Sequence, residues 1–321
     1  MSLIFTAPGT DARENLALDE FFLNALPPGQ ILLYFYINRP SVIIGRNQNP
    51  YLECDISRLK QDGVILARRV SGGGAVYHDE GNLNYSFLAH ESVYDEGRQT
   101  SIILDALKAL GLEAEVTGRN DICLDGLKIS GNAFAKRGAN HMRHGTLLVD
   151  ADLSVFSNYL TPSRLKLEAK GIKSVRSRVG NLKEKAPGIT VGGLKEAIIR
   201  EFEAAYGKAE EVSLFAGHEE EVSGLFRKHF SEEWLYGQTP AYDAFLETRL
   251  SWGLARLCFK VKEGRITDFG LFTDSLDTEV AERIYPLLIN KPFGRDAVVS
   301  ALAEGDENAR ELARALSEMA L

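Results

Sequence analysis

The chain has 321 residues but only three cysteines, Cys54, Cys123 and Cys258, which lie far apart. An odd number of distant cysteines favours neither a disulfide framework nor a zinc site. The longest apolar runs, such as 31–37, are too short to cross a bilayer. The first residues also lack the basic region and cleavage site of a secretory signal. We therefore expect a cytoplasmic protein that does not bind membranes.

Net positive charge is lacking as well. The formal net charge is −8, which argues against general nucleic-acid binding because that binding depends on phosphate neutralisation. Common nucleotide motifs are absent: no G-x-x-x-x-G-K-S/T occurs, and no G-x-G-x-x-G opens a helix after a strand. Hydrophobic residues at 45% and charged residues at 26% are ordinary values for a soluble protein. The length allows two domains.

The hydrophobic pattern mixes helices and strands without a regular βαβ repeat. Asp11 and Glu14 resemble a helix start, and an apolar stripe then continues to Ala25. Further helices are predicted at 101–110, at 194–205 and around 220–229. Strands are predicted at 31–37, 42–45, 64–70, 83–88, 113–117, 121–124, 127–135 and 141–149. This mixture predicts an α+β fold with mixed or antiparallel sheets and packed helices.

Near residue 245 the order of predicted elements starts again, with strands followed by helices. Strands are predicted at 247–251, 256–261 and 266–272, and helices at 278–288, at 295–303 and at the C-terminus. We therefore expect a main domain at 1–245 and a small α+β domain at 246–321.

The segment 68–87 is the most informative part of the sequence. Three consecutive glycines, Gly72–Gly74, follow Ser71 and the pair Arg68 and Arg69. Glycine lacks a Cβ, so a ligand can approach such a turn closely, and its N–H groups form a concavity that suits phosphate or carboxylate oxygens. With predicted strands on both sides, the segment is either an anion cradle with two guanidiniums at its mouth or a glycine-rich hairpin with solvated arginines. The residues alone leave both interpretations open.

A second candidate site lies at a predicted hairpin. Asp125 and Gly126 favour a two-residue turn, which brings Asp121 and Lys128 within a few residues of each other across the ladder. An oxygen ligand for Mg²⁺ beside an ammonium suits phosphate chemistry. An ordinary solvated lysine is the alternative.

Three other residues near these segments have reactive side chains. His78 and His144 are interpreted as wall or hydrogen-bonded residues rather than general bases, and Cys123 as an inert thiol in a buried strand. Residues 165–184 lack periodicity and carry six lysines or arginines against two glutamates. A solvated loop is the default interpretation of this segment, but a loop of this length is often a lid or binding segment.

Taken together, these segments resemble the lipoate–protein ligase family over nearly the whole chain. The matching motifs, in order, are 42–50, 68–76 with His78, Asp79, Gly81 and Asn82, then 118–121, 128–133, 144–148 and 170–182, with Trp234 and Gly237. The resemblance implies a biotin/lipoate ligase-like catalytic domain followed by an accessory domain. It also implies a two-step reaction, in which ATP activates lipoate to lipoyl-AMP and the lipoyl group is then transferred to a lysine of a carrier domain.

The resemblance also implies roles for individual residues. Lys128 would be catalytic, contacting both the lipoate carboxylate and the α-phosphate, and Asp121 would hold Mg²⁺. The implied nucleotide-binding residues are Arg69, Gly74, Ala75, Val76, Tyr77, Asn82, Asn120, Asp121, Lys128, Ser174 and Arg176. The implied lipoate-binding residues are Leu16, Leu18, Arg69, Ser71, Gly72, Gly73, His78, Lys128, Ala133 and His144. The implied partners are lipoyl domains of 2-oxoacid dehydrogenase acyltransferase subunits and the glycine-cleavage carrier protein.

Three alternatives differ in their chemistry. An octanoyl or lipoyl transferase of the same superfamily would act through a cysteine thioester without ATP, and Cys123 is a poor candidate for its thiol. A biotin ligase would carry a different glycine-arginine loop. A catalytically idle lipoate-binding module would bind lipoate without any lipoate-dependent exchange between ATP and pyrophosphate.

Overall fold

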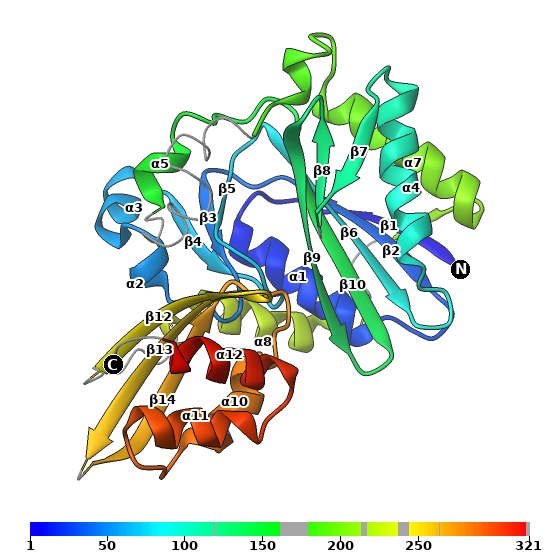
Figure 1. The fold of residues 1–321 in the computed structure, drawn as a ribbon. Coiled ribbons are helices and arrows are strands. Elements are labelled where there is room, and N and C mark those ends of the chain that lie inside the picture. The colour runs from blue at the N-terminus through cyan, green and yellow to red at the C-terminus, as the bar shows by residue number, and fades with distance from the viewer. Residues whose placement is uncertain (119, 161–178, 213–216, 237–243, 263, 319–321) are drawn as a thin grey trace.

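The computed structural model describes residues 1–118, 120–160, 179–212, 217–236, 244–262 and 264–318, which form three sheets with helices packed on them (Figure 1). The large sheet consists, in sheet order, of β11 (Glu210–Glu211), β1 (Ser2–Thr6), β2 (Ile31–Tyr36), β6 (Asn82–His90), β10 (Asn140–Leu148), β9 (Leu127–Arg137), β8 (Asp121–Leu124) and β7 (Ala114–Thr117). Its pairs are antiparallel except for β1, which runs parallel to both of its neighbours. The α+β prediction is confirmed.

A small sheet carries the glycine segment. Its strands, in sheet order, are β4 (Ile65–Arg68), β3 (Ser41–Ile44) and β5 (Val76–His78). β3 pairs with β4 in parallel and with β5 in antiparallel orientation. The glycines Gly72–Gly74 therefore connect two strands that flank β3 and do not pair with each other. The hairpin interpretation is wrong, because β5 lies between the glycines and the strand predicted at 83–88.

Helix α1 (Ala12–Ala25) lies between the two sheets. It begins as predicted, since the Asp11 side chain accepts a hydrogen bond from the backbone N–H of Arg13. Leu16 belongs to a cluster with Ile43 of the small sheet, whereas Leu18 belongs to one with Leu32 of the large sheet. The other helices of this part are α2 (Pro50–Glu53), α3 (Ile56–Asp62), α4 (Glu96–Ala109), α5 (Phe156–Tyr159), the 3₁₀ turn η2 (Leu182–Glu184), α7 (Val191–Tyr206), α8 (Glu219–Phe230) and α9 (Glu232–Tyr236).

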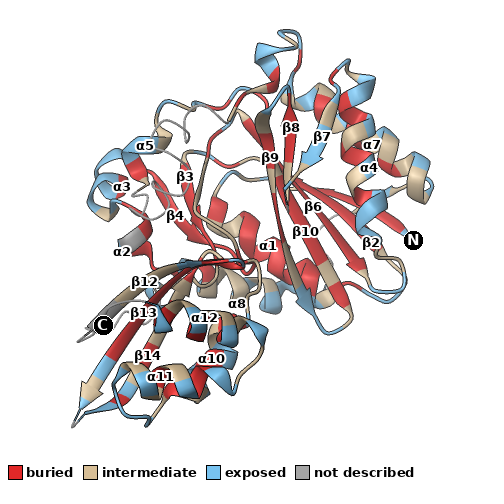
Figure 2. Cartoon of the chain, viewed as in Figure 1, coloured by how far each residue is buried: buried red, intermediate tan, exposed pale blue. Residues whose placement is uncertain are grey.

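Strand alternation divides the core of the large sheet between its two faces. Leu33 and Phe35 of β2 face the cluster that includes Ile102 of α4 and Leu194 of α7. The alternate residues of β2, Leu32, Tyr34 and Tyr36, belong to the cluster on the other face, against α1. Figure 1 shows α4 and α7 together on one face of the sheet and α1 on the other. The central strands β2, β6 and β10 are buried along most of their length, whereas the edge strand β7 is partly exposed (Figure 2).

The C-terminal part has its own antiparallel sheet and its own hydrophobic cluster. Its elements are β12 (Ala244–Leu250), β13 (Gly253–Lys262), β14 (Arg265–Thr273), α10 (Val280–Leu288), α11 (Arg295–Ala303) and α12 (Glu307–Ser317). The strands and helices predicted here are confirmed, while the boundary at 245/246 stays a prediction. In the described residues, no helix combines the length and the apolar character needed to span a membrane.

Candidate active site

The two arginines before the glycines do not stand at the mouth of the loop as expected. Arg68 is 5% exposed, and its guanidinium donates to five backbone carbonyls, among them those of Gly45 and Trp234. Arg69 is 7% exposed and donates to the carbonyls of Gly72 and Gly74. Both side chains therefore turn inward: Arg68 ties the 45–48 segment to Trp234 and Leu235, and Arg69 holds the glycine loop in shape. The expectation of solvated arginines fails because each guanidinium finds several carbonyl acceptors in the fold.

The buried guanidiniums also leave the loop positively charged. Within the described part of the chain, neither arginine forms an ion pair with a carboxylate. Burial accordingly lowers the pKa of Arg68 to about 10 and that of Arg69 to about 10, so both remain cationic at neutral pH. A buried cation without a counter-ion is costly, and an anionic ligand at the loop offsets that cost.

The hairpin predicted around Asp125 and Gly126 is present, with φ of 50° and 78° at these residues. It brings the Nζ of Lys128 to 2.7 Å from an Oδ of Asp121, as predicted, with side chains 37% and 35% exposed. The pairing register shifts between Ile122 and Cys123, which makes a β-bulge in this ladder. Bulges re-aim side chains near functional sites.

Gly131 makes room for the Lys128 side chain. A Cβ placed on Gly131 would lie 3.0 Å from Nζ and 3.1 Å from Cε of Lys128. The backbone of Lys128 is also contacted from outside the hairpin, because Val179 bridges to Lys128 and the N–H of Gly180 donates to its carbonyl at 3.1 Å. The described end of the predicted basic loop at 165–184 thus lies against the backbone of Lys128.

Asn120 lies at the start of β8 and is tied to Asn132. Its side-chain amide donates to the carbonyl of Asn132, and the Asn132 amide donates back to the carbonyl of Asn120 at 3.0 Å. Asn132 in turn accepts from the hydroxyl of Tyr85 at 2.6 Å. This network ties Asn120, the residue just before β8, to β9 next to Asp121.

The glycine loop and the large sheet meet at His144 of β10. Its Nε2 lies 2.6 Å from the hydroxyl of Ser71, and its Nδ1 lies 2.9 Å from an Oδ of Asp19 on α1. His144 pairs in register with Ala133 of β9. Three predicted lipoate residues, Ser71, Ala133 and His144, are therefore brought together. Asp19 was not among the predicted site residues, because in the sequence it stands beside Glu20 as one of two adjacent acidic residues on an amphipathic helix.

His78 is buried beside the same loop. Burial, followed by the positive charge of Arg69, lowers the pKa of His78 to about 3, so its imidazole is neutral at pH 7. The Nδ1 atom bonds the amide of Asn38 at 3.0 Å, while the buried Nε2 has no hydrogen-bond partner among the described residues. The same is true of the buried Oδ1 of Asn82, another predicted site residue. Unpaired buried polar atoms are uncommon and need an explanation, and a bound ligand would supply one.

Other predicted residues are placed differently. Leu16 and Leu18 are both buried and lie in separate hydrophobic clusters, Leu16 with residues of the small sheet and Leu18 with residues of the large sheet. Ala75, Val76 and Tyr77 are partly exposed at and just before β5. Ser174 and Arg176 lie outside the described residues.

The C-terminal part touches the glycine loop, which the sequence analysis did not foresee. The N–H of Gly73 donates to the carbonyl of Ser275 at 2.9 Å. A Cβ on Gly72 would lie 2.1 Å from the same oxygen, so only glycine allows this approach. A second contact joins the C-terminal part to α2, where an ion pair of 2.7 Å forms between the buried residues Arg256 and Glu53.

A metal ion has few protein ligands available here. In the described part of the chain, no group of three or more histidine, cysteine or acidic residues could hold one. Mg²⁺ is commonly bound by one or two carboxylates together with substrate phosphates. Asp121 fits that mode as a single carboxylate.

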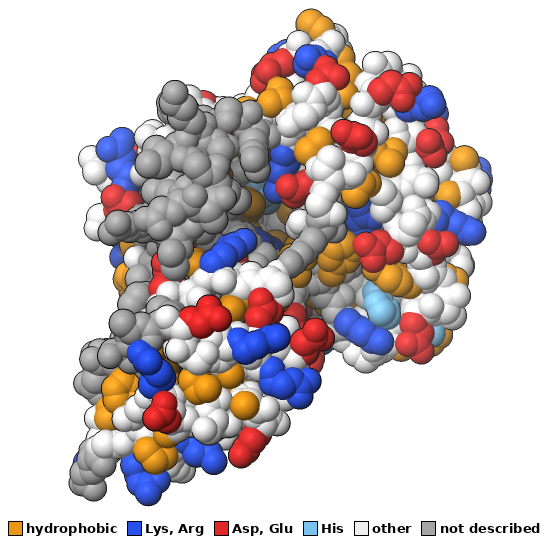
Figure 3. All heavy atoms as spheres, in the orientation of Figure 1, with side chains coloured by type: hydrophobic (Ala, Val, Ile, Leu, Met, Phe, Trp, Pro, Cys, Tyr) orange, Lys and Arg blue, Asp and Glu red, His pale blue; other side chains and the backbone are white. Residues whose placement is uncertain are grey.

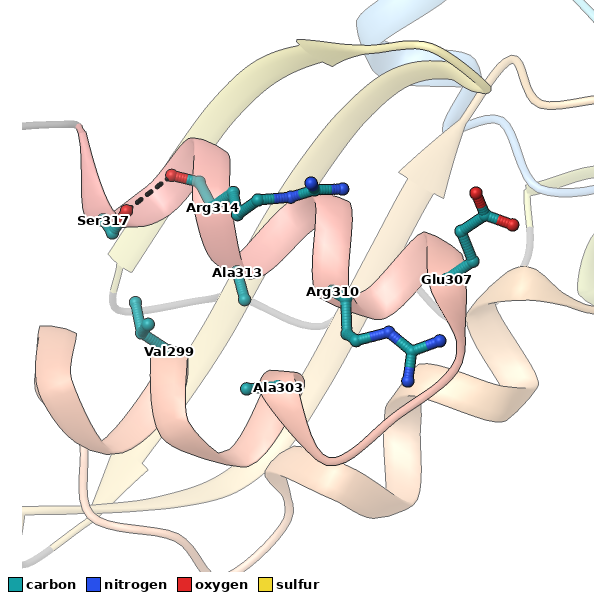
Figure 4. Close-up of a pocket in the computed structure, with 7 residues that line it drawn as sticks. All are labelled: Val299, Ala303, Glu307, Arg310, Ala313, Arg314 and Ser317. Atoms are coloured by element: carbon teal, nitrogen blue, oxygen red, sulfur yellow. Dashed lines mark hydrogen bonds between the residues drawn. The ribbon is translucent and has the colours of Figure 1, made fainter.

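A cavity of about 350 Å³ lies elsewhere in the described part of the chain. It is lined by residues of α11 and α12, including Ala303, Arg310 and Arg314 (Figure 4). On the molecular face in Figure 3, basic and acidic side chains are interspersed, without a broad basic surface. No predicted site residue lines the cavity between α11 and α12.

Comparison with known families decides the identity of the chain. Residues 11–203 match the model of the lipoyl protein ligase A/B catalytic domain, and residues 239–319 match that of the bacterial lipoate protein ligase C-terminus. The chain belongs to the lipoyl protein ligase A/B family. It is a ligase that carries both the catalytic domain and the C-terminal domain in one chain.

Solved structures agree with the family assignment. Plasmodium falciparum LipL1 in complex with lipoate is 29% identical, with a TM-score of 0.84, and the match covers 99% of this chain and 98% of that one. The bipartite lipoate protein ligase of Thermoplasma acidophilum, described with its E2 lipoyl domain, is 30% identical with a TM-score of 0.66, covering 76% and 99%. A lipoate-protein ligase A bound with ATP is 30% identical with a TM-score of 0.64, covering 74% and 98%.

The cysteines of this ligase argue against the thioester alternative. All three are buried. Burial raises the pKa of Cys54 to about 12 and that of Cys258 to about 11, and the Sγ of Cys123 is hydrogen-bonded to the hydroxyl of Thr117 at 2.9 Å. Because the thiolate is the nucleophile, none of these thiols is suited to carry an acyl group.

Proposed function

We propose that this ligase activates lipoate with ATP and transfers the lipoyl group to a lysine of a lipoyl carrier domain, with Lys128 as the catalytic residue. In the first step, a carboxylate oxygen of lipoate attacks the α-phosphorus of ATP, and the bond to pyrophosphate breaks. In the second step, a lysine amine of the carrier attacks the acyl carbon, loses a proton, and AMP leaves.

Lys128 supports the proposal most strongly. Two anions must meet in the first step, so fixed positive charge is the main requirement. The bulge in β9 and the missing side chain of Gly131 leave the Lys128 ammonium partly exposed rather than packed away. Asp121, at 2.7 Å, holds the ammonium in place and would be one oxygen ligand of Mg²⁺, which supplies further positive charge to the phosphates when bound.

The glycine loop provides the second group of contacts. Arg69 rigidifies it through the carbonyls of Gly72 and Gly74, and the buried guanidiniums of Arg68 and Arg69 add positive charge, so its N–H groups are arranged to hold phosphate or carboxylate oxygens. Ala133 lies five residues along β9 from Lys128, or about 16 Å of strand. The acid group of lipoate would lie at Lys128, and its apolar tail would extend toward Ala133 and His144.

The C-terminal domain would move during the reaction. In the structure, the N–H of Gly73 donates its hydrogen bond to the carbonyl of Ser275. In the proposed reaction this N–H would instead donate to the ligand, so the C-terminal domain must move away. The carriers proposed are lipoyl domains of 2-oxoacid dehydrogenases and the glycine-cleavage carrier protein, and the T. acidophilum relative described with an E2 lipoyl domain supports the first of these.

Lipoate-dependent exchange of labelled pyrophosphate into ATP tests the first step. Exchange that requires lipoate is expected. Lipoate binding without any exchange would instead indicate the idle binding module.

A further inference from the structure

Four side chains from three separate elements form one buried hydrogen-bonded chain behind the glycine loop. Asp19 on α1 contacts Nδ1 of His144 at 2.9 Å, and Nε2 of His144 contacts Oγ of Ser71 at 2.6 Å. Nε of Arg69 then donates to the same Oγ at 3.1 Å. All four residues are less than 9% exposed.

The contacts determine where the protons lie. A carboxylate only accepts hydrogen bonds, so the atom facing Asp19 is Nδ1–H. The Ser71 oxygen accepts from Arg69, and the one acceptor within reach of its hydroxyl among the described residues is Nε2 of His144. His144 is therefore the neutral Nδ1–H tautomer, with Nε2 accepting from Ser71.

The order Ser–His–Asp matches that of a hydrolase triad, but this serine is no nucleophile. Ser71 is 0% exposed, and its oxygen already accepts a hydrogen bond from a guanidinium. The chain instead connects α1 and β10 to Arg69, which holds the carbonyls of Gly72 and Gly74. Its effect is to fix the loop.

We infer that Asp19 is a positioning residue for the adenylation step: by fixing the tautomer of His144, it holds Ser71 and Arg69 and so preorganises the glycine loop. This inference rests on the proposed function. Tyr36 supports the placement, since its hydroxyl donates to the same Asp19 oxygen at 3.2 Å, while the other oxygen, Oδ1, is buried and finds no partner in the described part of the chain. The carboxylate is thus held by one oxygen only.

Two variants at position 19 separate the acceptor from the charge. Asp19→Leu removes the acceptor, and kcat for lipoate-dependent exchange is expected to fall about 10- to 100-fold, the size of effect seen when the hydrogen-bond partner of a metal-ligating histidine is lost. Asp19→Asn keeps one oxygen for Nδ1–H and can place its amide at the unpaired Oδ1 position, so it is expected to restore most of the rate.

A matched control comes from the next residue. Glu20→Met removes a buried carboxylate that bonds Lys228 and His229 instead. It is expected to lower stability but leave kcat unchanged at temperatures where the variant is folded. Equal losses of kcat in Glu20→Met and Asp19→Leu, or no rescue by asparagine, would overturn the inference.

A spectroscopic readout on the wild-type protein needs no variant to fold. ¹⁵N NMR of histidine-labelled protein is expected to assign the Nδ1–H tautomer to His144. The Nε2–H tautomer would refute the inference even if exchange is observed. Conversely, if the wild type shows no exchange but His144 has the expected tautomer, the proposed function fails while the hydrogen-bonded chain stands.

Discussion

Replacement of Lys128 by alanine separates catalysis from folding. The pair with Asp121 is about one-third exposed on each side, and such pairs contribute only about 0–1 kcal/mol to stability. The variant should therefore fold with nearly unchanged stability. In the proposed reaction, by contrast, the ammonium stabilises charge that develops between two anions. Loss of one preorganised donor typically raises a barrier by about 2.7–4 kcal/mol, which corresponds to roughly a 100- to 1000-fold loss of rate.

The hairpin offers a matched control. Lys185 pairs with Asp125 of the turn at the same distance, 2.7 Å, with side chains 43% and 62% exposed. Lys185→Ala breaks an equivalent ion pair without touching the predicted site. In lipoate-dependent ATP–pyrophosphate exchange, the control should retain the wild-type rate, and thermal unfolding should give similar midpoints for both variants. An equal rate in Lys128→Ala and the control would refute the assigned role of Lys128.

Three further predictions follow from the contacts. Gly72→Ala places a Cβ 2.1 Å from the Ser275 carbonyl, so X-ray scattering should detect displacement of the C-terminal domain, whereas Gly74→Ala, whose Cβ meets no atom within 4 Å, should not change the profile. The pKa of His78 is about 3 in the folded protein, against 6.5 for an unperturbed histidine, which represents the unfolded state. Between pH 6.5 and 3 the unfolded chain therefore binds a proton at His78 that the folded protein does not, and the protein loses stability as the pH falls below 6.5. Denaturant titrations should find about 1 kcal/mol from this group between pH 7 and 5.5, and a His78→Gln variant with an unchanged pH slope would contradict this. Cys123→Ser should keep the transfer rate of the wild type, since Cys123 is buried and bonded to Thr117; loss of transfer with the fold intact would revive the thioester route.

Local signals in the sequence were sufficient for the elements around the site. The turn at Asp125 and Gly126 requires φ > 0 at both positions, and that requirement is readable from residue type. The same turn brings Asp121 and Lys128 together. The helix start at Asp11 was readable because capping is also local.

Long-range contacts were not readable in the same way. The burial of Arg68 depends on carbonyls supplied by the 45–48 segment and by Trp234 and Leu235, which no local pattern reveals. The bulge that re-aims Lys128 depends on the pairing register. Asp19 looked like one polar residue on an amphipathic helix, and its contact with His144 spans 125 positions.

The most direct test of the account is the mass of an apo lipoyl domain after incubation with this ligase, ATP, Mg²⁺ and lipoate. The account predicts the gain of one lipoyl group on the carrier, and no gain when ATP is omitted. An unchanged carrier mass, or a gain that persists without ATP, would contradict it.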